Sequence, residues 1–161
     1  MTTKNTNVND TSSREIVITR LLNAPRELVF EAWTNPEHLI KWWGPRGFTN
    51  TFENLDIRPG GEWSWTMHGM GRDFPNKIVF HEVVKPEKLV YTHGDESDDN
   101  NFHVTVTFEK QGEKTFLKML SVFGSAEKRD LVVKEYGAIE GGNQTVDKLE
   151  EQLEIMKTGN K

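Results

Sequence analysis

The sequence predicts a single α+β domain in which six to seven antiparallel strands form a strongly curved sheet wrapped on one long C-terminal helix. Two observations support this fold class. Strand-like segments follow one another at short, regular spacing between residues 48 and 123, which is typical of an antiparallel meander and not of alternating strands and helices. The last third, from Val132 to Met156, places apolar residues at helical spacing.

The chain begins its regular structure with one strand and two short helices. From Arg14 the segment REIVITRLL alternates as a strand does, with Ile16 and Ile18 on one face. Pro25 suits the first position of a helix, which we expect to continue to Trp33. Asn35 and Pro36 start a second short helix, and Gly44 and Pro45 end it.

Six further strands are expected after these helices. The segment 62–68 has the clearest period of two, with Trp63, Trp65 and Met67 on one face and polar residues on the other. The acidic run at 95–99 lacks the glycine and the distal glutamate of a calcium-binding loop, so we interpret it as a solvated hairpin tip. The six predicted strands span 48–58, 62–68, 77–84, 88–93, 102–110 and 115–123.

The C-terminal helix contains two adjacent glycines, Gly141 and Gly142. Glycine inside a helix costs about 1 kcal/mol relative to alanine, so this pair needs a reason. We expect that the helix kinks at this pair, or that a neighbouring element approaches its backbone closely.

Composition excludes several classes of function. The chain has no cysteine, which removes disulfides and cysteine-ligated metal sites and suits a reducing, cytoplasmic location. No apolar run is long enough for a transmembrane helix, so we expect no membrane insertion. The net charge of −5 argues against a nucleic-acid partner, because phosphate binding needs clustered Lys and Arg. Residues 1–13 are polar and are expected to form a disordered tail, and residues 14–158 to form the single domain.

Several segments together resemble a known family. They are the run from Trp33 to Pro45 (WTNPEHLIKWWGP), the segment 56–63 (DIRPGGEW), the segment 82–91 (EVVKPEKLVY), VTVTF at 104–108 and GGNQTVDKL at 141–149. The chain is similar to the family named after the C-terminal domain of the heat-shock chaperone ATPase activators. That family lies in the START-like, or Bet v 1-like, superfamily, with polyketide cyclases and aromatase-type proteins. The resemblance implies a helix-grip fold with an internal cavity that binds a small apolar molecule.

One departure from the family concerns the last helix. The family often has Trp directly after the glycine of this helix, where the present chain has Gly142. The absence of a ring at this position leaves room near the middle of the helix, or lets another side chain or a ligand take the space.

We predict that this cavity is lined by inward-facing residues of the strands, by one Trp that follows the second short helix and by residues of the C-terminal helical region. Ordinary core packing is the alternative for most of them. Topology favours a cavity, because one helix cannot fill a curved sheet along its whole length. The predicted ligand-binding residues are Trp43, Trp63, Trp65, Met67, Phe80, Tyr91, Met119, Tyr136 and Gly142.

The sequence offers little for catalysis or for a metal. Converging zinc ligands, a nucleophile motif and a glycine-rich phosphate loop are all absent, so we expect no cofactor, no metal and no dedicated catalytic residue. The strand histidines are expected to face solvent. Glu53 and Glu82 are the two carboxylates that we expect could face inward, Glu82 because it shares a strand face with Phe80.

The leading hypothesis is therefore a non-catalytic module that binds a small apolar or aromatic molecule. Two alternatives remain. One is a cofactor-independent cyclase, dehydratase or hydrolase that uses the same cavity, with Tyr91, a histidine or a glutamate as acid–base groups. The other is an interaction module that stimulates a chaperone ATPase, as the family's name implies. A homodimer is also left open, because Phe116 and Leu120 fall on the strand face opposite Leu117 and Met119.

Overall fold

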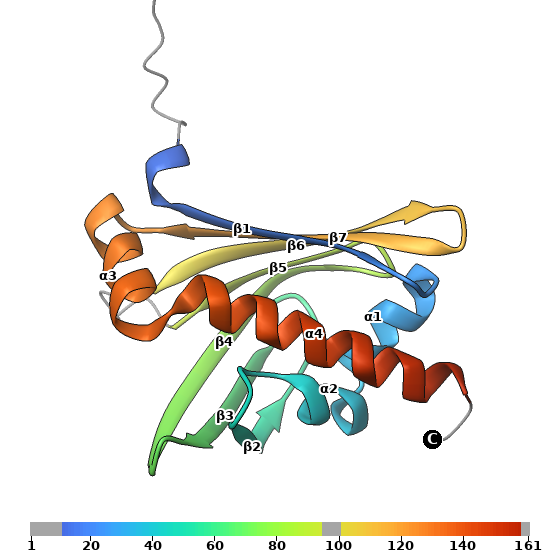
Figure 1. Cartoon of the computed structure of the whole chain (residues 1–161), viewed down its shortest axis with the longest axis horizontal. Coiled ribbons are helices and arrows are strands. Elements are labelled where there is room, and N and C mark those ends of the chain that lie inside the picture. The colour runs from blue at the N-terminus through green and yellow to red at the C-terminus, as the bar shows by residue number, and fades with distance from the viewer. Residues whose placement is uncertain (1–10, 95–100, 159–161) are drawn as a thin grey trace, which may run out of the picture.

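The structure, a computed structural model, describes residues 11–94 and 101–158, so the acidic run at 95–99 and most of the predicted tail lie outside the described residues. One antiparallel sheet curls around the long helix α4, while α1 and α2 close one end and α3 lies at the other (Figure 1). The strands are β1 (Glu15–Leu22), β2 (Thr49–Leu55), β3 (Glu62–Gly69), β4 (Arg72–Val84), β5 (Lys88–His93), β6 (Phe102–Gln111) and β7 (Lys114–Phe123). The helices are η1 (Ser12–Arg14), α1 (Arg26–Thr34), α2 (Pro36–Trp42), α3 (Ala126–Tyr136) and α4 (Ala138–Lys157).

The predicted fold class is confirmed, including the antiparallel meander. Strands β2 to β7 pair with their neighbours in sequence, and β1 pairs with β7, which gives the order β1-β7-β6-β5-β4-β3-β2. In the β1–β7 pair, Ile18 lies opposite Met119. The first strand and the last strand therefore lie side by side, and α4 crosses the face that they share with β5 and β6 (Figure 1).

Single residues explain where α2 begins and how the chain turns between β2 and β3. The side chain of Asn35 accepts a hydrogen bond from the backbone N–H of Glu37 at 3.0 Å, which caps α2, and Pro36 occupies its first position. Between β2 and β3, Gly60 has a φ of +84°, and a Cβ at Gly61 would lie 2.1 Å from the carbonyl oxygen of Asp56. Both glycines are therefore required by the tight turn at this point.

The break in the C-terminal helical region falls at Gly137 and not at Gly141–Gly142. Gly137 is in the left-handed conformation, and its N–H donates to the carbonyls of Val132 and Val133, which ends α3. Gly141 and Gly142 both lie inside α4. Of the two expectations for this pair, close approach of a neighbour is the one that the structure shows, because Ile18 of β1 packs against Gly142.

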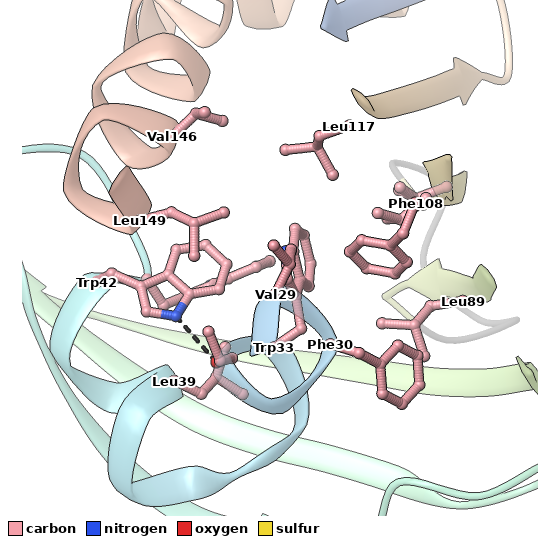
Figure 2. Close-up of a cluster of buried hydrophobic side chains, with 14 of the residues drawn as sticks. Val29, Phe30, Trp33, Leu39, Trp42, Leu89, Phe108, Leu117, Val146 and Leu149 are labelled. Atoms are coloured by element: carbon pink, nitrogen blue, oxygen red, sulfur yellow. Dashed lines mark hydrogen bonds between the residues drawn. The ribbon is translucent and has the colours of Figure 1, made fainter. Parts of the chain in front are cut away.

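The hydrophobic core occupies the half of the molecule that contains α1, α2 and the C-terminal half of α4. Leu149 of α4, Val29 of α1 and Leu117 of β7 point toward one another in Figure 2 and are all fully buried. Trp42 is fully buried too, and its indole N–H donates to the carbonyl of Ala32 at 3.0 Å. This end of the sheet is filled by side chains, so any cavity must lie toward the N-terminal half of α4.

The outer face of β1 and β7 carries apolar side chains as well. Val17 lies opposite Leu120, and Leu21 lies opposite Phe116, with Val17 and Leu21 almost half exposed. The last strand therefore does present apolar side chains on both faces, and the homodimer stays a prediction. Across residues 11–94 and 101–158, no helix is both long and apolar enough to cross a membrane.

Candidate functional site

A cavity of about 240 Å³ lies between the inner face of the sheet and the N-terminal half of α4. Four strands, β1, β7, β6 and β5, form its floor, and β3 contributes Met67. The segment that follows α2 forms one side, and α4 covers the top. The cavity thus occupies the end of the curved sheet that the core side chains do not fill.

The floor is built from rows of residues that lie opposite one another on neighbouring strands. The central row runs from Ile16 on β1 through Ser121 and Val104 to Tyr91 on β5. A second pair, Ile18 and Met119, lies beside it on the core side. A third row, Phe123, Phe102 and His93, lies on the other side.

The segment Trp43-Gly44-Pro45 forms the side of the cavity and is tied to α4. The Nζ of Lys148 donates to the carbonyl of Gly44 at 3.1 Å and lies 3.5 Å from that of Pro45. Burial lowers the pKa of Lys148, and the nearby guanidinium of Arg46 lowers this pKa further. Gly44 has a φ of +94°, a conformation that favours glycine, and the end of the Met67 side chain packs against it, since a Cβ there would lie 2.7 Å from Cε of Met67.

The covering helix contributes Ala138, Gly141, Gly142 and Thr145, whose small side chains leave space below α4. A Cβ at Gly142 would lie 2.2 Å from Cδ1 of Ile18. The space beside Gly142 is therefore taken in part by a side chain from β1. The hydroxyl of Thr145 donates to the carbonyl of Gly141 at 2.9 Å and is satisfied within the helix.

Two hydroxyl groups on the floor have no hydrogen-bond partner among the described residues. Tyr91 is 3% exposed, and its ring packs edge-to-face against Phe80, with centroids 5.9 Å apart. Burial raises the pKa of Tyr91 well above its ordinary value, so its hydroxyl stays protonated at neutral pH. Ser121 lies in the same row, with Val104 between the two. These hydroxyls are available to a bound molecule.

His93 lies on the inner face and lines the cavity, so the expectation that the strand histidines all face solvent is wrong for this residue. It is two residues from Tyr91, and the period of two along β5 puts both on one face, which is the signal that sequence reasoning missed. Its Nε2 donates to Oδ1 of Asn76 at 3.0 Å. Its ring stacks on Phe102, and Phe102 stacks on Phe123, with centroid separations of 4.9 and 4.6 Å.

The structure places five of the nine predicted site residues at the cavity, namely Trp43, Met67, Tyr91, Met119 and Gly142. The pair Trp42 and Trp43 divides as one core residue and one cavity residue, with Trp43 8% exposed. Trp43 also contacts the rings of the four other tryptophans, at centroid distances between 4.9 and 5.9 Å.

Three other predicted site residues, Trp63, Trp65 and Phe80, are buried but do not belong to the lining. Trp63 and Trp65 stack on each other at 3.9 Å, and Trp43 packs against both, so the space in front of this part of β3 is filled by a ring. Tyr136 is the last residue of α3, and its side chain lies outside the described part of the structure.

The two glutamates that we expected could face inward are both exposed. A β-bulge between Phe80 and Glu82 shifts the alternation of β4 by one residue, so Phe80 is buried while Glu82 points outward and pairs with Lys88 at 2.8 Å. A similar irregularity between Phe52 and Asn54 interrupts β2 around Glu53, which accepts a hydrogen bond from Thr66. Sequence alternation alone cannot reveal such bulges.

The outward-facing histidines make hydrogen bonds on the surface and do not converge on a metal. His81 and His103 both bond to the hydroxyl of Thr92, at 2.7 and 2.8 Å, and His68 pairs with Asp73. Within residues 11–94 and 101–158, no group of three or more His, Asp or Glu side chains is arranged to hold a metal ion.

Sequence comparison identifies a family model that covers most of the chain. The model described as "Activator of Hsp90 ATPase homolog 1-like protein" matches residues 23–154, which include both short helices, strands β2 to β7, α3 and most of α4. No curated protein matches the sequence.

Solved structures of similar shape come from several bacteria. The crystal structure of protein NE0264 from Nitrosomonas europaea superposes with a TM-score of 0.82 and 26% identity, covering 91% of this chain and 98% of that one. A solution structure of a protein from Arthrobacter aurescens has a TM-score of 0.81 and 25% identity over 91% of this chain and 89% of that one. Protein Ms6760 from Mycobacterium smegmatis has a TM-score of 0.78 and 25% identity, over 88% and 91% of the two chains.

Proposed function

The chain belongs to the family of Activator of Hsp90 ATPase homolog 1-like proteins, with a START-like fold, and we propose that it binds a small, mainly apolar molecule in the cavity beneath α4. The observation that carries this proposal is the cavity itself. Its wall is continuous from β1 to β5, and most of the side chains in it are apolar. Burial of apolar ligand surface, at about 0.8 kcal/mol for each CH₂ group, supplies the affinity.

The size of the cavity supports a compact ligand. An engineered apolar cavity of about 150 Å³ holds benzene. The present volume of about 240 Å³ therefore suits a molecule of one substituted ring or two fused rings. A long-chain lipid would extend well beyond this space.

Charge in and around the cavity supports a neutral ligand. No Asp, Glu, Lys or Arg is among the described residues that line it. Lys148 lies nearby, but its ammonium group bonds to the backbone carbonyls of Gly44 and Pro45. A buried ion without a counter-charge is strongly disfavoured, so the site selects against charged molecules.

An enzyme that uses the same cavity stays a prediction and is not our proposal. Acid–base catalysis needs a group that accepts a proton near neutral pH. Burial raises the pKa of Tyr91, which makes it a hydrogen-bond donor and a poor base, and no carboxylate lines the described cavity. His93 is the remaining candidate. Stimulation of a chaperone ATPase, to which the family's name refers, also stays a prediction, and an ATPase assay with Hsp90 would measure it directly.

The proposal is tested first by native mass spectrometry of protein purified from the organism that makes it. We expect a fraction of the protein to carry an additional mass that is lost on denaturation. The cavity volume predicts an added mass of a one- or two-ring compound. A spectrum that always shows the bare chain, together with no thermal shift in a library of small aromatic molecules, would contradict the proposal.

Cavity-filling variants show whether binding occurs at this site. Val104→Phe places a ring on the floor, and Ala138→Leu adds volume from the covering helix; either should weaken binding of naphthalene at least tenfold. Val17→Phe adds the same bulk as the first variant on the outer face of β1, where Val17 is 48% exposed. This control should bind naphthalene like the wild type. Equal loss in all three variants, or in none, would place the binding elsewhere.

A further inference from the structure

Two hydroxyl groups lie on the floor of the cavity, at the two ends of the row formed by Ser121, Val104 and Tyr91. Neither the Tyr91 hydroxyl nor the Ser121 hydroxyl has a hydrogen-bond partner among the described residues, while the Thr145 hydroxyl already bonds to Gly141. A molecule that fills the cavity displaces water from these hydroxyls, and a polar group shielded from water is unfavourable unless it is paired. An oxygen atom on the bound molecule would pair one of them.

In the third row of the floor, the stacking of the rings leaves the edge of Phe102, and not its faces, toward the cavity. Phe102 lies between His93 and Phe123 and stacks on both, with interplanar angles of 26° in each case. Because its two faces are covered by its neighbours, Phe102 can present only its edge to the cavity. Aromatic edges carry partial positive charge and attract the face of another ring. This wall therefore favours a flat aromatic molecule over a saturated one of equal size.

From these two observations we infer that the ligand is an uncharged, planar aromatic molecule that carries one hydrogen-bonding oxygen, such as a phenol or an aryl ketone. Its oxygen pairs with the hydroxyl of Tyr91 or with that of Ser121, and its ring lies against the edge of Phe102. This inference rests on the proposed function and adds the chemical class of the ligand. Burial raises the pKa of Tyr91, so its hydroxyl stays protonated and can donate a hydrogen bond at neutral pH.

The test uses three probes of nearly equal shape: naphthalene, 2-naphthol and 2-naphthoate. Their Kd values at pH 7 are measured by titration against the fluorescence of the tryptophan cluster around Trp43, and by calorimetry. Loss of one hydrogen bond between neutral groups changes a Kd by about three- to tenfold. We therefore expect Tyr91→Phe to raise the Kd of 2-naphthol relative to that of naphthalene by about three- to tenfold, and Ser121→Ala to have a smaller effect in the same direction.

Each of the two substitutions removes one hydroxyl and adds no heavy atoms. Neither hydroxyl has a partner in the described structure, so both variants should fold. Naphthalene has no oxygen and reports any change in the cavity itself, so the ratio of the two Kd values isolates the hydroxyl. The charged 2-naphthoate should bind at least a hundredfold more weakly than 2-naphthol. Cyclohexanol, a saturated alcohol, has no aromatic face, so it should gain no affinity from the edge of Phe102.

The outcomes separate this inference from the proposed function. If naphthalene binds and Val104→Phe abolishes its binding, the cavity is a ligand site. An unchanged ratio of Kd values in Tyr91→Phe and Ser121→Ala would then overturn the assignment of the oxygen. Tight binding of 2-naphthoate would overturn the requirement for a neutral molecule. If none of the probes binds to the wild type, this inference fails, and native mass spectrometry with the library screen decides the proposed function.

Discussion

Gly142 of α4 and Ile18 of β1 approach so closely that a Cβ on the glycine would lie 2.2 Å from Cδ1 of the isoleucine. Both residues line the cavity. The glycine therefore lets the first strand and the last helix pack together, at the cost in helix stability that glycine brings. A side chain from β1 therefore takes part of the space beside the glycine.

This contact predicts a non-additive pair of substitutions. Gly142→Ala should gain little or lose stability, because the new methyl group displaces Ile18, although alanine is favoured in helices by about 1 kcal/mol. In the Ile18→Val background, which lacks Cδ1, the same substitution should stabilise the protein by about 1 kcal/mol. Urea unfolding of the four proteins measures the coupling. Gly141→Ala is the matched control, since its Cβ would lie 3.4 Å from Pro45, and it should show no coupling to Ile18.

Tyr91 predicts a loss of stability at alkaline pH. The unfolded chain releases the phenolic proton near pH 10, while the folded state holds it to higher pH because burial raises the pKa. The stability that depends on this group is therefore complete below about pH 10 and falls as the pH rises further. Between pH 9 and pH 11, the free energy of unfolding of the wild type should fall by about 1 kcal/mol more than that of Tyr91→Phe. Parallel curves for the two proteins would contradict the burial of this hydroxyl.

Thr115 predicts a loss of stability from a change that barely alters shape. Its fully buried hydroxyl donates to the carbonyl of Ala24 at 2.7 Å, which fixes the loop before α1 onto β7. Thr115→Val leaves that carbonyl unpaired and should lower the free energy of unfolding by about 1–3 kcal/mol. Thr19→Val, on the exposed face of β1, should change it by less than about 0.5 kcal/mol. Equal effects of the two substitutions would show that the buried hydrogen bond contributes nothing.

Replacing Lys148 should loosen the side of the cavity formed by Trp43, Gly44 and Pro45. Its ammonium group bonds to the carbonyls of Gly44 and Pro45, which tie the side wall to α4. Lys148→Met should increase hydrogen exchange of the amides from 43 to 47 and speed the dissociation of naphthalene severalfold. Lys41→Met, at an exposed position on α2, is the control and should leave both unchanged. Faster exchange without faster dissociation would show that this segment is not the route by which the ligand leaves.

Much of the fold follows from periodicity, whereas the position of the cavity depends on contacts between distant segments. The alternation in β3 correctly puts Trp63 and Trp65 on the inner face, yet Trp43, which comes from a segment twenty residues earlier, fills the space before them. The bulge next to Glu82 reverses the face of a residue whose side the alternation predicts. These outcomes depend on tertiary packing and on register, which a pattern along one segment does not contain.

The helical region shows a similar division. Its apolar spacing predicts a helix correctly, and the adjacent glycines mark a real structural requirement. The break occurs earlier, at Gly137, because its left-handed conformation ends α3 and redirects the chain into α4. Phe102, Val104 and Phe123 complete the floor without standing out in the sequence, because a strand residue that lines a cavity looks like one that packs in a core.

The pairing of β1 with β7 determines how late in synthesis the sheet can be completed. Ile18 meets Met119 only after about a hundred intervening residues have left the ribosome, and α4, which covers both, is made later still. Contacts between such distant segments slow folding, because the chain must close a long loop before they form. Until then the inner faces of β5 to β7 are uncovered apolar surface. The cavity is thus the last part of the molecule to be completed, and apolar surface of this kind that is exposed during folding favours aggregation.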